Sequence, residues 1–319
     1  MTQGESRGPP RVSRRSLQSD GKLTAQNDTL PEIMREMDEF LAAVQAAVQR
    51  DSPHLLDLFR TFAQEARFAR LWIADDLRRL AVDAKVLEVG AGSMLLSCQL
   101  RREGIAVTAL EPIGEGFGAF AELQRLVLQH AAREDAAPEV LALPAEDLTA
   151  SDEYAFAFSL NVMEHVIDYG ATLGNIARAL RPGGRFRFAC ANYVFPYEPH
   201  FNIPILFSKQ LTERLFRKRI FQHPSVSDPE GVWSSLNWIT VPKVRKALSG
   251  MPDISLDFNT RMFETLLERV LEDEEFARRR SPLICGVIRA LVRSKLHRLT
   301  RWIPATIQPM MDCALVRLE

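Results

Sequence analysis

A short glycine-containing segment has the residue types of a cofactor-binding turn. Residues 85–89 form an apolar, partly β-branched run that carries the acid Glu88. Gly90, Ala91 and Gly92 follow directly, and a helical pattern comes after them. Glycines let the backbone approach a ligand closely and turn sharply. The carboxylate of Glu88 suits an ammonium or hydroxyl group, whereas a phosphate would be repelled by it.

A second acid, Glu111, ends the apolar run 105–110. An acid about twenty residues after such a turn can hold both ribose hydroxyls of an adenosine. The dinucleotide fingerprint also requires a third glycine, which is absent because Ser93-Met94-Leu95 follows instead. A nicotinamide oxidoreductase is therefore a poorly supported alternative.

These residues resemble the E/D-x-G-x-G-x-G strand-turn-helix of the class I S-adenosylmethionine-dependent methyltransferases. Glu88, Gly90 and Gly92 match it, and Met94 replaces the last glycine. Later segments resemble the same family in order and spacing, over roughly residues 85–191: the turn that receives adenine (143–148), the fourth strand and its turn (158–166) and the loop before the fifth strand (180–184).

The resemblance implies that S-adenosyl-L-methionine is the cofactor, with Glu88 and Gly90 near its methionine moiety and Glu111 on its ribose. Pro144 stands where relatives often carry an aspartate, so that Asp147 or the backbone alone is an alternative contact for the adenine. The full set of predicted cofactor-binding residues is Glu88, Gly90, Ala91, Gly92, Glu111, Ala145, Glu146 and Asn161.

The acceptor side must align the acceptor with the methyl group and, for a hydroxyl or amine, remove a proton. His200 lies in the aromatic and proline-rich segment 192–201, just past the fifth predicted strand, and is the predicted base. Tyr193 and His165 are further catalytic candidates. In the alternative interpretation this segment is a buried connector, and His200 merely bonds a backbone carbonyl.

Glu164 and His165 raise the question of a metal. Some members of the superfamily, including ubiquinone-pathway O-methyltransferases and small-RNA 2′-O-methyltransferases, bind a divalent ion through an E-x-x-E-H motif at this place. Here Asn161 replaces the first acid, which weakens a site for a hard cation. We therefore predict no metal and keep a Glu164–His165 metal site as the alternative.

Short apolar runs alternate with helical patterns from residue 85 onward, which indicates a parallel sheet. The predicted fold is a doubly wound α/β fold with a mostly parallel seven-stranded sheet. Its strands are expected at 85–89, 105–110, 139–143, 154–160, 185–191, 253–259 and 313–318, and helices at 93–103, 116–134, 170–180, 206–221 and 241–249. The resemblance implies that the last two strands are an antiparallel pair.

Residues 1–28 lack apolar periodicity and are predicted to be a disordered tail. Residues 29–82 are predicted to form N-terminal helices, one starting at a Thr29/Glu32 capping box and a second running from Ser52-Pro53 to Leu77. They form either a lid over the cofactor or a bundle on the sheet edge. Residues 83–319 form the methyltransferase-like domain, with acceptor-side insertions at about 192–240 and 261–308.

The amino-acid composition limits the classes of partner molecule and the cellular environment that we expect for this protein. The 40 basic and 41 acidic residues nearly cancel, so no global basic field attracts nucleic acid. The four cysteines are far apart, which favours free thiols, and no apolar run reaches the roughly 20 residues of a membrane span. We predict a cytoplasmic protein.

Two basic stretches, 209–219 and 278–301, interrupt this balance. The second has the pattern of a basic amphipathic helix. Such a helix can lie on an anionic membrane or contact a phosphorylated acceptor, and in the third alternative its apolar stripe packs on the domain.

The predicted function is methyl transfer to oxygen, less favourably nitrogen, of a small-molecule or sugar-type acceptor. The alternatives are methylation of a nucleic acid or lipid-linked substrate, and a non-catalytic partner protein that keeps the fold.

Overall fold

The computed structural model describes residues 29–112, 118–224, 226, 228–278 and 280–319. The predicted tail, residues 1–28, lies outside the described residues. Within the described part, no helix combines the length and the apolar character that a membrane crossing requires. All four cysteines are buried and unpaired.

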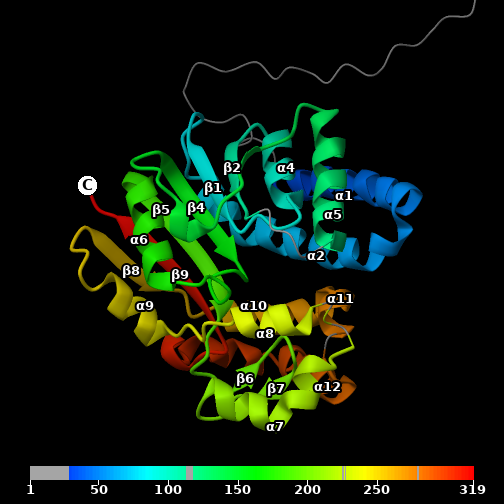
Figure 1. Cartoon of the computed structure of the whole chain (residues 1–319), viewed down its shortest axis with the longest axis vertical. Helices are drawn as coiled ribbons and strands as arrows, with labels where there is room; N and C mark the ends of the chain where they lie inside the picture. Colours follow the sequence, from blue (N-terminus) through cyan, green and yellow to red (C-terminus); the bar gives the residue numbers. More distant parts are fainter. Residues whose placement is uncertain (1–28, 113–117, 225, 227, 279) are drawn as a thin grey trace, which may run out of the picture.

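A seven-stranded sheet forms the centre of the molecule, as predicted (Figure 1). The strands lie in the order β3-β2-β1-β4-β5-β9-β8; those from β1 to β5 are parallel, and β9 runs antiparallel to both β5 and β8. The order reverses between β1 and β4, which is where open α/β sheets bind their ligands. The bounds are β1 (Lys85–Val89), β2 (Ala106–Leu110), β3 (Glu139–Leu141), β4 (Tyr154–Leu160), β5 (Leu180–Ala191), β8 (Ile254–Phe258) and β9 (Met310–Arg317).

The central strands are apolar on both faces because helices cover both faces. Val86 and Phe158 belong to the core on one face, while Leu87 and Phe188 belong to the core on the other. The first face is covered by α1 (Leu30–Asp51), η2 (Pro53–Leu55), α2 (Leu56–Trp72), α3 (Ala74–Leu77), α4 (Leu95–Arg102) and α5 (Gly118–Ala132). The second is covered by α6 (Tyr169–Ala179) and α9 (Val241–Leu248).

The N-terminal helices begin at the predicted cap, where the backbone N–H of Thr29 donates to Glu32 Oε2 at 2.7 Å. Helix α1 packs on α4 and α5, and α2 packs on α4, so both rest on the helix layer of this face. The predicted second helix is not continuous. It consists of η2, α2 and α3, with a break at Ile73, whose φ of −90° and ψ of 2° leave the α-helical region.

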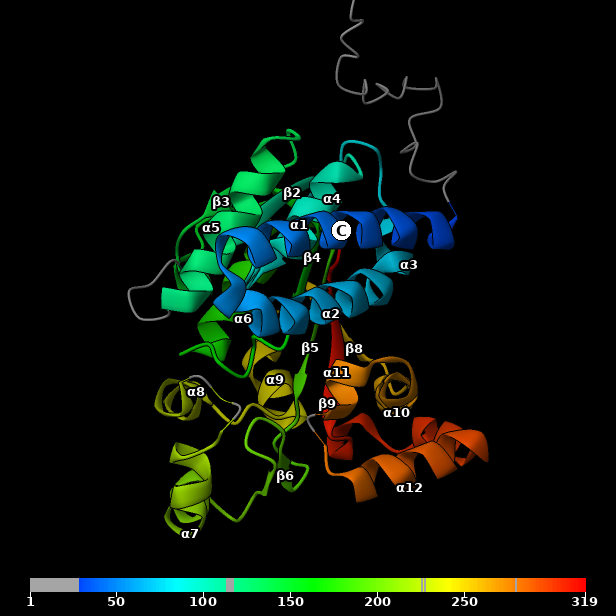
Figure 2. The same cartoon turned by 90° about the vertical axis from the view of Figure 1, so that its right-hand side faces the viewer.

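Two groups of elements extend from the sheet and lie at the same end of the molecule (Figures 1 and 2). The first follows β5 and contains β6 (Tyr197–Glu198), β7 (Ile203–Pro204), α7 (Lys209–Phe221) and α8 (Pro229–Ser235). The second lies between β8 and β9 and contains α10 (Met262–Glu272), α11 (Glu274–Arg278), α12 (Pro282–Arg293), η4 (Leu296–Trp302) and η5 (Ala305–Ile307). The β6–β7 hairpin was not predicted, because two-residue strands are too short to show a period.

Candidate active site

The turn after β1 carries the glycines. Gly90 has a φ of +74°, and a Cβ built there would lie 2.3 Å from Val162 Cγ2, so any side chain would collide with the loop after β4. Gly92 has a φ of +54°, but a Cβ would meet nothing nearer than 3.7 Å. Met94, at the place of the last glycine of the motif, keeps a left-handed φ of 64° and is fully buried. The departure from the motif therefore leaves the glycine-like backbone of the turn in place.

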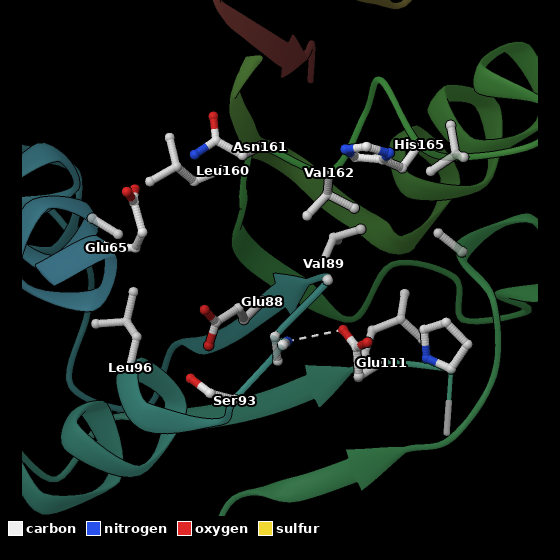
Figure 3. Close-up of a pocket in the computed structure, with 18 of the residues that line it drawn as sticks. Glu65, Glu88, Val89, Ser93, Leu96, Glu111, Leu160, Asn161, Val162 and His165 are labelled. Carbon is white, nitrogen blue, oxygen red and sulfur yellow. Dashed lines mark hydrogen bonds between the residues drawn. The ribbon is translucent and has the colours of Figure 1, made fainter. Parts of the chain in front are cut away.

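Glu111 follows β2 and secures this turn. Its Oε2 accepts a hydrogen bond from the backbone N–H of Gly92 at 2.9 Å (Figure 3). The backbone N–H of Gly90 donates to Leu110 O at 2.8 Å. Burial raises the pKa of the Glu111 carboxyl, and the Gly92 N–H opposes that rise. The backbone N–H of Ala91 also donates to Leu110 O, at 3.3 Å, so three hydrogen bonds join the tips of β1 and β2, one of them to an acid.

Glu88 is 8% exposed and accepts a hydrogen bond from Ser97 Oγ of α4. Burial raises the pKa of Glu88 to about 8; the Ser97 hydroxyl opposes this rise, and the nearby Glu111 charge adds to it. The carboxyl is therefore mostly protonated at neutral pH. A bound cation would favour its ionised form and lower this pKa again.

These acids border a cavity of about 560 Å³. Figure 3 shows Glu65, Glu88 and Glu111 arranged around it, from α2, β1 and the end of β2. Glu146 is the fourth acid of the lining, and within the described part of the chain none of the lining residues is a lysine or arginine. The remaining lining is largely apolar and includes Phe62, Ala66, Ala69, Val89, Leu96, Leu110, Leu160, Val162, Val166 and Ile167.

This donor set fits S-adenosylmethionine, whose ammonium and sulfonium groups are positively charged. A cavity whose described lining holds four acids, a neutral histidine and no lysine or arginine would be a poor site for a pyrophosphate. Every predicted cofactor residue lines this cavity: Glu88, Gly90, Ala91, Gly92, Glu111, Ala145, Glu146 and Asn161. Their individual roles stay predictions.

The short helix η3 (Ala145–Asp147) contains the predicted adenine-edge residues. Ala145 is buried in the lining. Glu146 Oε1 accepts from the backbone N–H of Ile167 at 2.6 Å and of Asp168 at 3.1 Å, so its carboxylate joins η3 to the loop after β4. Asp147, the alternative contact, is exposed and lies outside the lining.

The loop after β4 carries Asn161 and Glu164. Asn161 has a φ of 57° and donates its backbone N–H to Ala189 O at 2.8 Å, which turns the chain at the cavity wall. Glu164 is 1% exposed, and its Oε2 has no hydrogen-bond partner among the described residues. Burial raises its pKa to about 7, while the nearby His200 lowers it.

His165 lines the cavity, and its Nδ1 lies 2.8 Å from Ser235 Oγ of α8. Burial lowers the pKa of His165 to about 3, and the neighbouring His200 and Lys209 add to this effect. The ring is therefore neutral at physiological pH. The imidazole of His200 lies edge-on to it, with ring centroids 5.1 Å apart.

His200 lies behind His165 and is not in the cavity lining. Its Nδ1 is 2.6 Å from Glu198 Oε1, and Glu198 is fully buried. Glu198 Oε2 also accepts from the backbone N–H of Phe201 at 2.8 Å. The hairpin therefore positions a carboxylate–histidine pair, and the alternative of a His200 bound only to a backbone carbonyl does not describe this arrangement.

Three potential ligand atoms meet at this point. Side-chain atoms of Glu164, His165 and His200 lie within 4.8 Å of one another. A second such group, formed by Glu264, Glu268 and His297, lies in the helical insertion. His297 Nε2 is already 2.9 Å from Glu268 Oε1 there.

Tyr193 lies outside the cavity lining, contrary to its predicted place at the site. It is 6% exposed, its ring stacks on Trp238 at 5.7 Å, and its hydroxyl donates to Glu198 Oε1 at 3.3 Å. Burial raises its pKa well above the usual value. This environment gives Tyr193 a packing role within the insertion.

Sequence reasoning missed several residues of the site. Glu198 stands two residues before His200. This short spacing in the sequence could have predicted that Glu198 is the acid that orients the histidine. Glu65 belongs to the polar side of α2 and lies 3.2 Å from Arg269 of α10, a distance that joins two segments about two hundred residues apart. No local pattern indicates that contact.

Comparisons with known proteins agree with this geometry. A family model described as "Methyltransferase domain" matches residues 59–223. An uncharacterized protein of Mycobacterium tuberculosis (strain H37Rv) is 47% identical over 295 residues, which cover 92% of this chain and 100% of that protein.

Two further similarities are more limited. A ubiquinone biosynthesis O-methyltransferase of Paramagnetospirillum magneticum is 35% identical over 107 residues, which cover 34% of this chain and 40% of that enzyme. The solved structure of Haemonchus contortus phosphoethanolamine N-methyltransferase 2 with S-adenosyl-L-methionine has a TM-score of 0.49 and 16% identity. That match covers 86% of this chain and 60% of the other chain.

Proposed function

Because this chain belongs to the class I S-adenosylmethionine-dependent methyltransferases, we propose that it methylates an oxygen atom of a small-molecule or sugar-type acceptor. The observation that carries the proposal is the cavity at the ends of β1, β2 and β4, which is lined by four acids and, among the residues that the structure describes, by no lysine or arginine. Such a cavity favours a cationic methyl donor.

On the cofactor side, the proposal assigns Glu88 to the ammonium group and Glu111 to the ribose hydroxyls. The turn from Gly90 to Gly92 provides backbone next to the donor, and Ala145 with Glu146 forms the adenine edge. When bound, S-adenosylmethionine supplies an electrophilic methyl group. The protein's own side chains orient the acceptor and take up the proton that the acceptor loses.

On the acceptor side, His200 is the proposed base; because it lies outside the cavity lining, next to His165, the acceptor hydroxyl would contact it past the His165 ring or through one bridging water. The Glu198 carboxylate at 2.6 Å orients its imidazole and stabilises the imidazolium that forms when a proton is taken up. His165 lines the cavity as a neutral ring held by Ser235, and we assign it to positioning the acceptor. The presence of a base favours a hydroxyl over an amine as the acceptor. A hydroxyl must lose its proton during methyl transfer, whereas a neutral amine can lose its proton afterwards.

One observation favours a second candidate for the acceptor side, a divalent cation held by Glu164, His165 and His200. Their ligand atoms lie within 4.8 Å, and the buried Glu164 Oε2 has no hydrogen-bond partner among the described residues. A cation there would ionise the acceptor hydroxyl directly. Titration calorimetry of the full chain with Mn²⁺, Zn²⁺ and Mg²⁺, repeated on Glu164→Gln, separates the two candidates. If His200 acts as a base without a metal, no cation gives a heat of binding. If the metal site exists, a cation gives a heat of binding to the wild type that the variant lacks.

The main proposal is tested in two steps. Calorimetry with S-adenosylhomocysteine, with NAD as the comparison ligand, tests the cofactor: we expect binding of the first alone. Methyl-labelled S-adenosylmethionine, incubated with the protein and a bacterial extract that contains both small molecules and nucleic acids, then tests transfer to a product that gains one CH₂. Transfer that survives in His200→Ala at the wild-type rate would remove His200 as the base, and label found only in nucleic acid would replace the acceptor class.

A further inference from the structure

The helix α12 carries more apolar surface than the domain covers. Cys285 is the only one of its described residues that is buried, and its Sγ lies 3.4 Å from Ala277 O of α11. Leu283 and Val287 are 79% and 54% exposed on another side of the helix. A helix that only packed against the domain would bury this side as well.

The following helix η4 continues the exposed apolar surface. Leu296, Leu299 and Trp302 are 53%, 60% and 76% exposed. His297, in the same element, is 3% exposed and bonds Glu268 of α10. This buried contact fixes the orientation of η4, so the exposed side chains belong to an anchored surface.

The same segment is strongly basic. Residues 281–309 contain five cations and no acid, within a chain whose net charge is −1. All five cations are exposed: Arg289, Arg293, Lys295, Arg298 and Arg301. Apolar side chains next to cations, with a tryptophan among them, are typical of protein surfaces that lie in the headgroup region of an anionic bilayer.

A second element at the same end of the molecule has a similar character. Helix α7 lies with α12 at the lower end of both views (Figures 1 and 2). Phe207, just before α7, is fully exposed, and Leu215 is 62% exposed. Arg217, with the neighbouring Lys218 and Arg219, adds exposed positive charge to this helix, against the single acid Glu213.

We propose that the exposed residues of α12 and η4, supported by α7, bind the surface of an anionic lipid bilayer. The inference concerns where the protein works and does not depend on which acceptor atom receives the methyl group. A second copy of the chain is disfavoured as the occupant, because two such surfaces would bring their cations together. A nucleic acid would use the cations but leaves the exposed leucines, Val287 and Trp302 unexplained.

Co-sedimentation of the full chain with vesicles tests the proposal. One set of vesicles contains phosphatidylcholine alone, and the other contains phosphatidylcholine with about one third phosphatidylglycerol. We expect binding to the anionic set that is at least about tenfold stronger and that weakens with salt, because each cation near an anionic surface contributes about fivefold.

Three double variants identify the surface. Arg293→Glu/Arg298→Glu should lower binding at least about tenfold. Leu283→Ser/Val287→Ser keeps every charge and should still weaken binding severalfold, because the apolar contact is lost. Arg125→Glu/Arg133→Glu makes the same change in net charge on α5 and the turn after it, at the other end of the molecule, and should bind much more strongly than the first variant (Figure 1).

All three variants change exposed residues, and binding of S-adenosylhomocysteine with unchanged affinity verifies their folding. Equal binding to both vesicle sets, no binding to either, or an equal loss in the α5 control would overturn the proposal. So would a dimer in sedimentation velocity that the Leu283→Ser/Val287→Ser variant dissociates, since it would make a second copy the occupant. RNA binding that this variant retains in full, without vesicle binding, would assign the cations to nucleic acid.

Discussion

The two sides of the cavity handle buried charge in different ways. On the proposed cofactor side, Glu88 and Glu111 have neutral donors, the Ser97 hydroxyl and the Gly92 N–H. On the acceptor side, Glu164 lies near His200, and Glu198 bonds His200 directly. The proposed cofactor side therefore holds acids that a cationic ligand would ionise, whereas the proposed acceptor side pairs Glu198 with His200 and keeps Glu164 beside them. Binding of a cationic cofactor should therefore change protonation mainly at Glu88 and Glu111.

The largest expected effect comes from Gly90→Ala, which would disrupt the junction of both sides. The new Cβ collides with Val162, and the backbone of residue 90 has a φ that an alanine rarely adopts. We therefore expect the unfolding free energy to fall by about 2–5 kcal/mol and cofactor binding to be lost. Denaturant unfolding and calorimetry measure the two losses. Gly104→Ala is the control: its φ is +82° but nothing lies within 4 Å of the added Cβ, so about 1 kcal/mol and unchanged affinity are expected.

Glu88→Gln tests the cofactor side alone. The amide fills the same space but removes the negative charge, so we expect affinity for S-adenosylhomocysteine to fall roughly 10- to 100-fold. Binding to the wild type at pH 7 should also release a proton from Glu88, whose pKa is about 8 in the free protein. Calorimetry in buffers of different ionisation enthalpy detects that proton. Proton release that persists in the variant would contradict the assignment to Glu88.

Glu198→Gln tests the acceptor side in the same way. Loss of the carboxylate that orients His200 should slow methyl transfer about tenfold while cofactor affinity stays unchanged. Glu213→Gln is a matched control in the same insertion, because Glu213 bonds Trp233 Nε1 and Arg217. A parallel loss of cofactor binding in Glu198→Gln would mean that the two sides are not separate.

The stability of the folded protein should depend on pH through the buried Glu88. Glu88 has a folded-state pKa of about 8 against an ordinary value of 4.5, so the folded protein keeps a proton that the unfolded chain has lost between these values. Its contribution to stability is present below about pH 4.5 and is lost as the pH rises through 8. Relative to Glu88→Gln, the ligand-free wild type should lose on the order of 1 kcal/mol per pH unit in this window. Denaturant melts at pH 5, 6, 7 and 8 measure the difference, and parallel curves would contradict it.

The smallest effect is expected for Ser235→Ala. It removes the partner of His165 Nδ1 at 2.8 Å, so the ring loses one orienting contact but stays neutral. We expect methyl transfer to slow about threefold without a change in cofactor affinity. A loss as large as that of Glu198→Gln would make His165, rather than His200, the more important histidine.

Much of the sheet could be predicted because its signals are local. The apolar runs that became β1, β2 and β4 are buried on both faces, and such strands need no partner to be recognised. The broken second helix and the β6–β7 hairpin could not be predicted in this way. The break at Ile73 interrupts a continuous apolar stripe, and the hairpin is shorter than any detectable period.

The types and spacing of residues along the chain were enough to predict which turn lines the cavity, because Glu88, Gly90 and Gly92 lie within five residues and Glu111 follows at the next strand end. Backbone geometry allows few conformations for such a turn, so residue types alone point to its ligand. The proposed acceptor side and the outer surface depend instead on how distant segments pack together. The contact of His165 with Ser235 spans seventy residues, and the exposure of Leu283 and Trp302 depends on how the last insertion packs. Such long-range contacts depend on the packing of whole elements, which no local pattern specifies.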